Sequence, residues 1–204
     1  MNEKVRSLVE QMRRLEGELR TALHEQETRV LYQIEGTAVH FRGTVRRAHE
    51  GVRVGVVRWL KESSPRNVLS APIIYSMIVP FAFLDLAITV YQQLCFRLYR
   101  IPRVQRSQFI VIDRHRLAYL NAIEKLNCVY CGYANGVVAY TREITSLTEQ
   151  YWCPIKHARQ VLGSHRRYAG FVDYGDAEAY RAKLPDKRAE LTREAEEAEA
   201  RKGS

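Results

Sequence analysis

The sequence predicts a mainly α-helical protein. A long N-terminal helix comes first, then a Pro-broken helical segment in the membrane, then a small metal-stapled helical domain in the cytoplasm. Three observations predict this class: apolar residues spaced by threes and fours near the N-terminus, a long stretch with one charge, and a Cys/Cys/Cys/His set after it. We expect four regions: 1–66, an amphipathic or coiled-coil-like helix; 67–96, the membrane segment; 97–175, the metal-binding domain; 176–204, a charged helical or disordered tail.

The first region carries two apolar stripes at helical spacing. The first stripe is a heptad-like seam made of Val5, Leu8, Met12, Leu15, Leu19 and Ala22. The second runs from Leu23 to Val52 after a slip in phase, which resembles a stutter. Four glycines weaken the second helix by about 1 kcal/mol each relative to alanine, so we expect a break near Gly36, Gly43, Gly51 or Gly55. The seam either packs on the rest of this chain or makes a homo-oligomer through residues 1–60.

The second region is too apolar for an ordinary soluble helix. From Asn67 to Phe96 the only charged residue is Asp85. One span needs about 20 apolar residues and two need about 40, so this length fits neither simply. Pro72 and Pro80 interrupt it, which leaves open a single tilted span or a re-entrant or monotopic hairpin turning near Pro80. A buried helical hairpin of a soluble protein is a third interpretation. Asp85 is then either a functional carboxylate in the membrane or part of the hairpin turn.

The net charge of +9 indicates an anionic partner. Basic residues bracket the apolar segment on both sides: Arg53, Arg58, Lys61, Arg66, Arg97, Arg100, Arg103 and Arg106. We therefore expect membrane lipid as the partner and no nucleic acid, since no nucleic-acid-binding signature is present. Positive flanks and the lack of a secretory signal place the protein at the inner (cytoplasmic) membrane, with the metal domain facing the cytoplasm.

The third region contains the residues that suggest chemistry. Cys128 and Cys131 form a C-x2-C pair, and after 21 intervening residues Cys153 and His157 form a C-x3-H pair. Three thiolates and one imidazole match the tetrahedral ligand set of structural zinc, so we predict zinc bound by these four residues. An iron–sulfur cluster with the same ligands is the alternative. If neither forms, the cysteines are small buried apolar residues and the histidine is an ordinary polar one.

Helices should present these ligands. Asp113 is expected to cap a first helix, Asn135-Gly136 to mark a turn or restart, and a second helix to end near Trp152. Three carboxylates near the ligands either orient His157 or are ordinary helix charges: Glu124, Glu143 and Glu149. The many aromatic residues here either wall the metal domain or lie at the lipid interface.

Three sequence segments together resemble an uncharacterised family of bacterial membrane-associated proteins. They are Asp113-Arg-His115, Asn127-Cys-Val-Tyr-Cys-Gly-Tyr-Ala-Asn-Gly136 and Glu149-Gln-Tyr-Trp-Cys-Pro-Ile-Lys-His157, and the resemblance extends over roughly residues 66–175. It implies a bacterial origin and no established activity, so it assigns no catalytic residue.

Together these observations predict a membrane-anchored metal-binding scaffold or assembly module. The alternatives are a membrane-associated iron–sulfur electron-transfer protein and a membrane-bound metalloenzyme. The sequence leaves open whether the protein is an enzyme.

Overall fold

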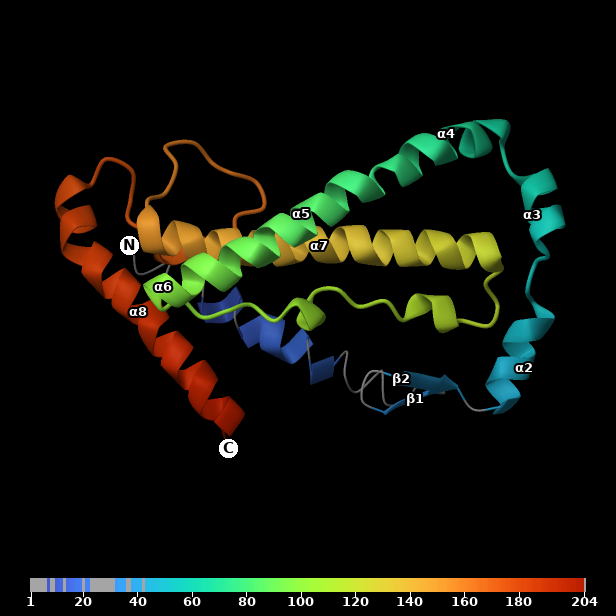
Figure 1. Cartoon of the computed structure of the whole chain (residues 1–204). Helices are drawn as coiled ribbons and strands as arrows, with labels where there is room; N and C mark the ends of the chain where they lie inside the picture. The colour runs from blue at the N-terminus through green and yellow to red at the C-terminus, as the bar shows by residue number, and fades with distance from the viewer. Residues whose placement is uncertain are drawn as a thin grey trace. The chain divides into compact units, whose positions relative to one another are not determined.

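The structure is a computed structural model, and it is mainly helical, as predicted (Figure 1). It describes residues 43–203, the strands at 32–35 and 38–41, and residues 7, 10–12, 14–19 and 21–22 of the N-terminal region. The described residues divide into two compact units, one from residues up to 63 together with 113–129, the other from 64–112 together with 130 onward.

The N-terminal region differs from the long helix that the sequence predicts. The described residues between 7 and 22 are helical, but strands β1 (Tyr32–Glu35) and β2 (Ala38–Phe41) then pair antiparallel, with Tyr32 opposite Phe41. The apolar residues here fit two periods. Ile34, Ala38 and Phe41 follow a helical spacing, whereas Tyr32 with Ile34, and Val39 with Phe41, alternate as in a strand.

The predicted break at glycine is confirmed. Helix α2 (Gly43–Gly51) begins and ends at a glycine, and Gly55 precedes α3 (Val56–Glu62) in an extended conformation. Glycine has a low helix propensity because its backbone loses the most conformational freedom on folding. In place of the second predicted helix, the described residues form strands β1 and β2 and the two short helices α2 and α3.

The apolar segment forms one long helical run, not a hairpin. It consists of α4 (Pro65–Ser76), α5 (Ile78–Tyr91), the π-helical turn η1 (Gln92–Phe96) and α6 (Arg97–Tyr99). Pro65 occupies the first turn, where its missing N–H is not needed, and Ser64 precedes it. Met77 keeps a helical conformation between α4 and α5, and Pro80 lies inside α5. This corrects the predicted turn near Pro80, and with it the placing of Asp85 in that turn.

After α6 the chain reverses and returns as an extended segment, residues 101–112 (the return segment), which contains only the short 3-10 turn η2 (Arg106–Gln108). The second 3-10 turn, η3 (Arg114–Arg116), follows Asp113, which makes no side-chain cap. Helix α7 (Ala122–Trp152) is one continuous helix of 31 residues. The expected capping at Asp113 and the turn at Asn135-Gly136 are therefore corrected.

Asn121 provides the start of α7 instead. Its side-chain carbonyl oxygen accepts hydrogen bonds from the backbone N–H groups of Ile123 and Glu124, both at 3.0 Å. The Glu124 carboxylate accepts one in return from the Asn121 backbone N–H at 2.9 Å. This is a capping box, so Glu124 has the structural role that the sequence left open for it.

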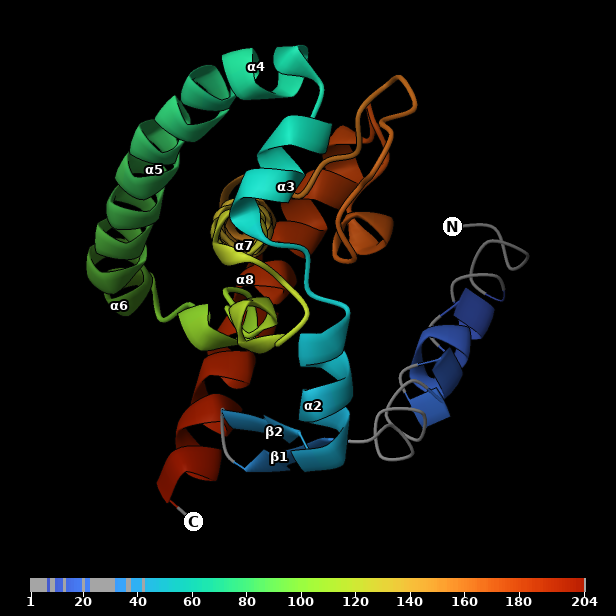
Figure 2. The ribbon, with the colours of Figure 1, turned by 90° about the vertical axis from the view of Figure 1, so that its right-hand side faces the viewer.

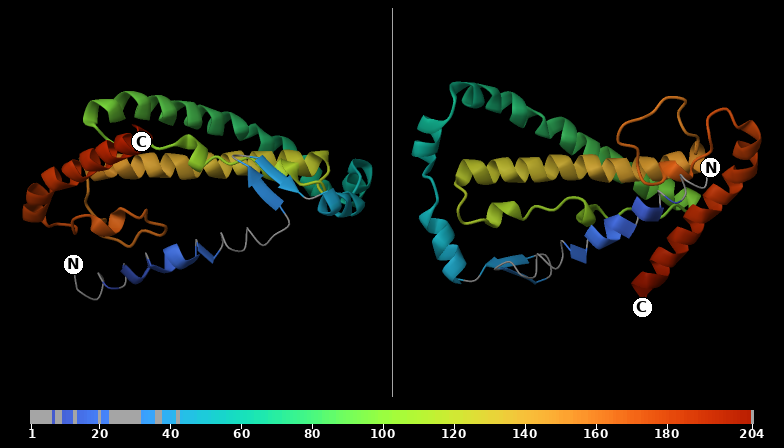
Figure 3. Two further views of the ribbon diagram at one scale, coloured as in Figure 1. Left: turned by 90° about the horizontal axis from the view of Figure 1, so that it is seen from below. Right: turned by 180° about the vertical axis from the view of Figure 1, so that it is seen from behind.

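The chain after α7 forms a closed loop and a last helix. The loop spans residues 153–176, includes the 3-10 turn η4 (Tyr168–Gly170), and is tied by the bridge between Ile155 and Val172. Helix α8 (Ala177–Gly203) follows, so the tail is helical. Seen along α7, the α4–α6 run and this loop lie on different sides of it (Figures 2 and 3). Leu191 of α8 is fully buried in the core with Phe96, Ile101, Tyr140, Ile144 and Leu147.

Candidate membrane interface

The α4–α6 run is the one described helix that is long and apolar enough to cross a membrane. It has 35 residues, and only 6% of its most apolar window is buried inside the protein. A core helix of a soluble protein would be mostly buried instead. Large exposed side chains follow one face at helical spacing: Val79, Phe83, Leu86, Val90, Leu94 and Leu98. We call these six residues the outer stripe.

The opposite face packs on protein and holds a buried carboxylate. Asp85 accepts two hydrogen bonds from Arg106 of the return segment, from Nε at 2.9 Å and from Nη2 at 2.6 Å. The Tyr133 hydroxyl of α7 donates a third, at 3.0 Å. Bidentate charge-assisted bonds of this kind are among the strongest in proteins. Asp85 is thus satisfied by two partners that lie 21 and 48 residues away in the sequence.

The titration of Tyr133 responds to the same contact. Burial raises the pKa of the Tyr133 hydroxyl, and the hydrogen bond to the Asp85 carboxylate raises it further. The phenol therefore stays protonated and remains a donor throughout the neutral range.

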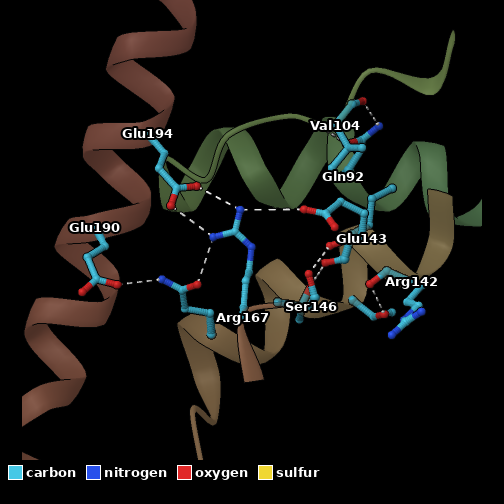
Figure 4. A network of polar contacts seen from close by, with 12 residues as sticks. Gln92, Val104, Arg142, Glu143, Ser146, Arg167, Glu190 and Glu194 are labelled. Atoms are coloured by element: carbon cyan, nitrogen blue, oxygen red, sulfur yellow. Dashed lines mark hydrogen bonds and ion pairs between the residues drawn. The ribbon is translucent and has the colours of Figure 1, made fainter. Parts of the chain in front are cut away.

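A second polar contact fixes the return segment two turns further along the helix. The buried Gln92 side chain bonds both backbone groups of Val104: Oε1 accepts from the N–H at 3.0 Å, and Nε2 donates to the carbonyl at 3.3 Å (Figure 4). Gln92 also donates to the Tyr140 hydroxyl of α7. Gln92 opens the π-helical turn, where the ordinary helical ladder is interrupted.

Gly136 lets α7 approach the return segment closely. A Cβ atom at this position would lie 2.7 Å from the Phe109 carbonyl oxygen and 2.9 Å from the Ile110 Cα. Both are backbone atoms, which cannot move aside as a flexible side chain would. This is the reason for a glycine in the middle of a long helix.

A network around Arg167 joins the loop, α7 and α8 (Figure 4). The Arg167 guanidinium bonds Glu194 of α8 at 3.0 and 3.1 Å, the Gln150 side-chain oxygen of α7 at 3.1 Å, and lies 3.7 Å from Glu143. Gln150 in turn donates to Glu190 of α8 at 3.2 Å. The network holds α8 and the loop against α7, on which the apolar helix also packs.

Glu149, like Glu143, has a partner other than His157. Its carboxylate lies 2.8 Å from His165 Nε2. His157 is exposed; its backbone N–H donates to the Tyr168 hydroxyl at 2.7 Å, and its ring stacks on Tyr168. The two glutamates therefore fix the loop, a role that the sequence could not indicate because Arg167 and His165 lie many residues away.

The four predicted zinc ligands are not brought together. Cys131 lies within α7 and Cys153 directly after its end, and the 22-residue separation along a helix corresponds to about 33 Å. Cys128 lies one turn before Cys131, and His157 follows Cys153 in the loop; all four cysteines are free thiols. Within the described ranges no group of three or more His, Cys, Asp or Glu side chains is placed to hold a metal ion. Zinc or a cluster bound by all four thus stays a prediction, which this arrangement of α7 does not favour.

Aromatic residues gather where α6 and α7 end. Tyr99 contacts Tyr151 and Trp152 at ring-centroid distances of 5.1 and 5.3 Å. The Arg188 guanidinium of α8 lies over the Tyr151 ring, 4.7 Å from its centroid. Tyr, Trp and Arg at the end of an apolar helix are typical of the level of lipid head groups.

Comparison with protein-family models, with curated proteins and with solved structures gave no significant match.

Proposed function

We propose that this protein is a membrane-anchored assembly module, in which the α4–α6 run holds a helical platform of α7, α8 and the loop at the bilayer. The observation that carries the proposal is the exposure of the longest apolar helix. A helix of 35 residues with 6% of its apolar window buried leaves a large apolar surface uncovered. Exposed patches of this kind indicate a lipid or protein contact.

The polar contacts of the inner face suggest how deep the helix enters. Arg106 is about half exposed where it pairs with Asp85, and an arginine facing hydrocarbon is costly. The return segment has unpaired backbone, which the hydrocarbon region does not tolerate. We infer that residues 67–84 face lipid with their exposed side only, because Tyr75 in this stretch contacts Tyr130 of α7, with ring centroids 5.7 Å apart. The outer stripe continues the lipid-facing side as far as Leu98.

The platform is expected on the cytoplasmic side. Basic residues flank the apolar segment on both sides, and cytoplasmic flanks are enriched in such residues: Arg53, Arg58, Lys61 and Arg66 before it, and Arg97, Arg100, Arg103 and Arg106 after it. The bacterial inner membrane is the compartment that this orientation fits.

Assembly is assigned to the N-terminal residues. Met12, Leu15 and Leu19 are exposed on one helical seam, as a self-associating helix requires. Light scattering of the detergent-solubilised protein should show an oligomer that Leu15→Lys dissociates. The matched variant Glu16→Lys, off the seam, should leave the oligomer intact. A wild-type monomer would remove this part of the proposal.

Membrane extraction tests the anchor. We expect the protein to stay with membranes through washes in high salt and in alkaline carbonate. Phe83→Arg, on the exposed outer stripe, should weaken retention, since an arginine near the helix centre costs about 2.5–3.5 kcal/mol in insertion. Val138→Arg places the same charge on an exposed position of α7 and should not. Release of the wild type by salt alone would refute the anchor.

A further inference from the structure

A pocket of about 530 Å³ lies where the reversal of the chain after α6 meets α8. Its lining includes an arginine wall from the reversal, Arg97, Arg100 and Arg103, and a carboxylate wall from α8, Glu196 and Glu199. Phe96 and Ile101 line the pocket as well, and both are buried. The pocket therefore offers positive groups, negative groups and an apolar floor within one ligand-sized volume.

The charged groups on the two walls do not satisfy one another. In the described part of the chain, Arg97, Arg100, Glu196 and Glu199 make no ion pair or side-chain hydrogen bond, although α8 elsewhere pairs closely through Glu190 and Glu194. Arg103 donates only to the Gln93 side chain, at 3.1 Å. Opposed charges that flank a pocket without closing on each other leave room for a ligand that carries both signs.

The backbone at Arg100 adds a second observation. Arg100 is the one non-glycine residue with positive φ among those the structure describes, at 53°. It ends α6 in the left-handed conformation, and the Ile101 N–H bonds back to the Phe96 carbonyl at 2.9 Å. Glycine or asparagine usually fills this position, because a side chain there costs about 1 kcal/mol. An arginine in this strained conformation, on the lining of the pocket, points to a use for its guanidinium.

We propose that this pocket binds the head group of a phosphoethanolamine lipid. The phosphate is bound by the arginine wall, the primary ammonium by Glu196 and Glu199, and the glycerol end lies on Phe96 and Ile101. Guanidinium groups favour phosphate oxygens, and carboxylates accept hydrogen bonds from an ammonium group. The site rests on the proposed function, since it needs the end of the apolar helix at the membrane surface, as its neighbours Tyr99 and Trp152 suggest.

Native mass spectrometry of the full-length protein in detergent tests this, with phosphatidylethanolamine, phosphatidylglycerol and phosphatidylcholine as titrants. We expect phosphatidylethanolamine to bind about tenfold or more tightly than phosphatidylcholine, whose quaternary ammonium cannot donate hydrogen bonds. Glu196→Gln with Glu199→Gln should reverse the preference toward phosphatidylglycerol. Arg97→Gln should weaken both.

Arg100→Gly separates binding from folding, because glycine relieves the left-handed backbone while it removes the guanidinium. We expect an unchanged or higher melting temperature together with lost lipid preference. Arg181→Gln removes an equal charge from an exposed position of α8 outside the pocket and should leave binding unchanged.

Equal binding of the three lipids by the wild type, or full lipid preference in Arg100→Gly, would overturn the proposal. Soluble phosphoethanolamine binding as tightly as the lipid would overturn its lipid part. These outcomes are independent of the anchor, because a protein that resists salt extraction yet shows no lipid preference refutes the pocket alone.

Discussion

Arg106 and Asp85 form a bidentate ion pair that joins the return segment to the inner face of the apolar helix. The carboxylate is buried and the guanidinium is about half exposed, so the ion pair lies at the edge of the protein interior. It is also the point where the chain changes from a helix that is apolar on all sides to one with a polar, protein-covered face.

Removing one partner of this ion pair should lower the free energy of unfolding more than removing both partners. Arg106→Leu leaves the Asp85 carboxylate buried with only the Tyr133 hydroxyl, and we expect a loss of about 1.5–3 kcal/mol in the free energy of unfolding. The double variant Asp85→Leu with Arg106→Leu should recover most of that loss. Urea titration in detergent measures both; a double variant as unstable as the single one would contradict this explanation.

Gly136→Ala should destabilise the platform. The added methyl group would press on the Phe109 carbonyl oxygen and the Ile110 Cα, and overpacking of this kind costs about 1–3 kcal/mol. Gly51→Ala is the control, because nothing lies within 4 Å of its added Cβ. Thermal unfolding should show a lower melting temperature for the first variant and an equal or higher one for the second.

Stability should fall at alkaline pH through Tyr133. Folding raises the pKa of its hydroxyl, so the contribution is complete below the ordinary tyrosine pKa of about 10 and is lost as the pH rises through the folded-state value. Tyr133→Phe removes this group, so its unfolding free energy should decline less steeply than that of the wild type above about pH 10. Parallel declines would show that the hydroxyl is not linked to folding.

The cysteines should react independently of metal. Cys131 and Cys153 are exposed free thiols, so a maleimide should modify both in the folded protein at the same rate with zinc or with a chelator. Zinc protection of both, together with one zinc per chain that Cys153→Ser abolishes, would restore the four-ligand site. It would also require α7 to break between them.

The apolar segment was predictable because its evidence is local: length and lack of charge suffice to indicate a helix long and apolar enough to cross a membrane. Its shape was not, since Pro80 near a helix start is compatible with both a turn and a continuing helix. The strands at 32–41 were missed because the same apolar residues satisfy two periods. Gly136 was misread as a turn because its cause is the backbone of residues 109 and 110, which the sequence does not place beside it.

The sequence could not predict the polar contacts of the candidate interface, because the partners lie far apart in the sequence. Asp85 stood out in the sequence because it is the one charge in the apolar segment. Nothing in the sequence marks Arg106 and Tyr133 as its partners, because only the reversal of the chain after Tyr99 brings them to it. The metal site predicted from the Cys and His pairs stays a prediction. Their spacing suits a metal ion only if the 21 residues between them fold back, and a continuous α7 holds the two pairs apart.

The sequence separation between Asp85 and its partners also determines when these residues can meet during synthesis. At about 5–20 residues per second, the ribosome needs roughly 2–10 s to make the 48 residues from Asp85 to Tyr133. During that interval the carboxylate has no donor from α7 and is best hydrated by water, so it should halt the entry of the nascent helix at its own position. We expect a nascent chain arrested before Arg106 to stop at the same depth as the finished protein, which site-directed thiol labelling of the stalled chain would reveal.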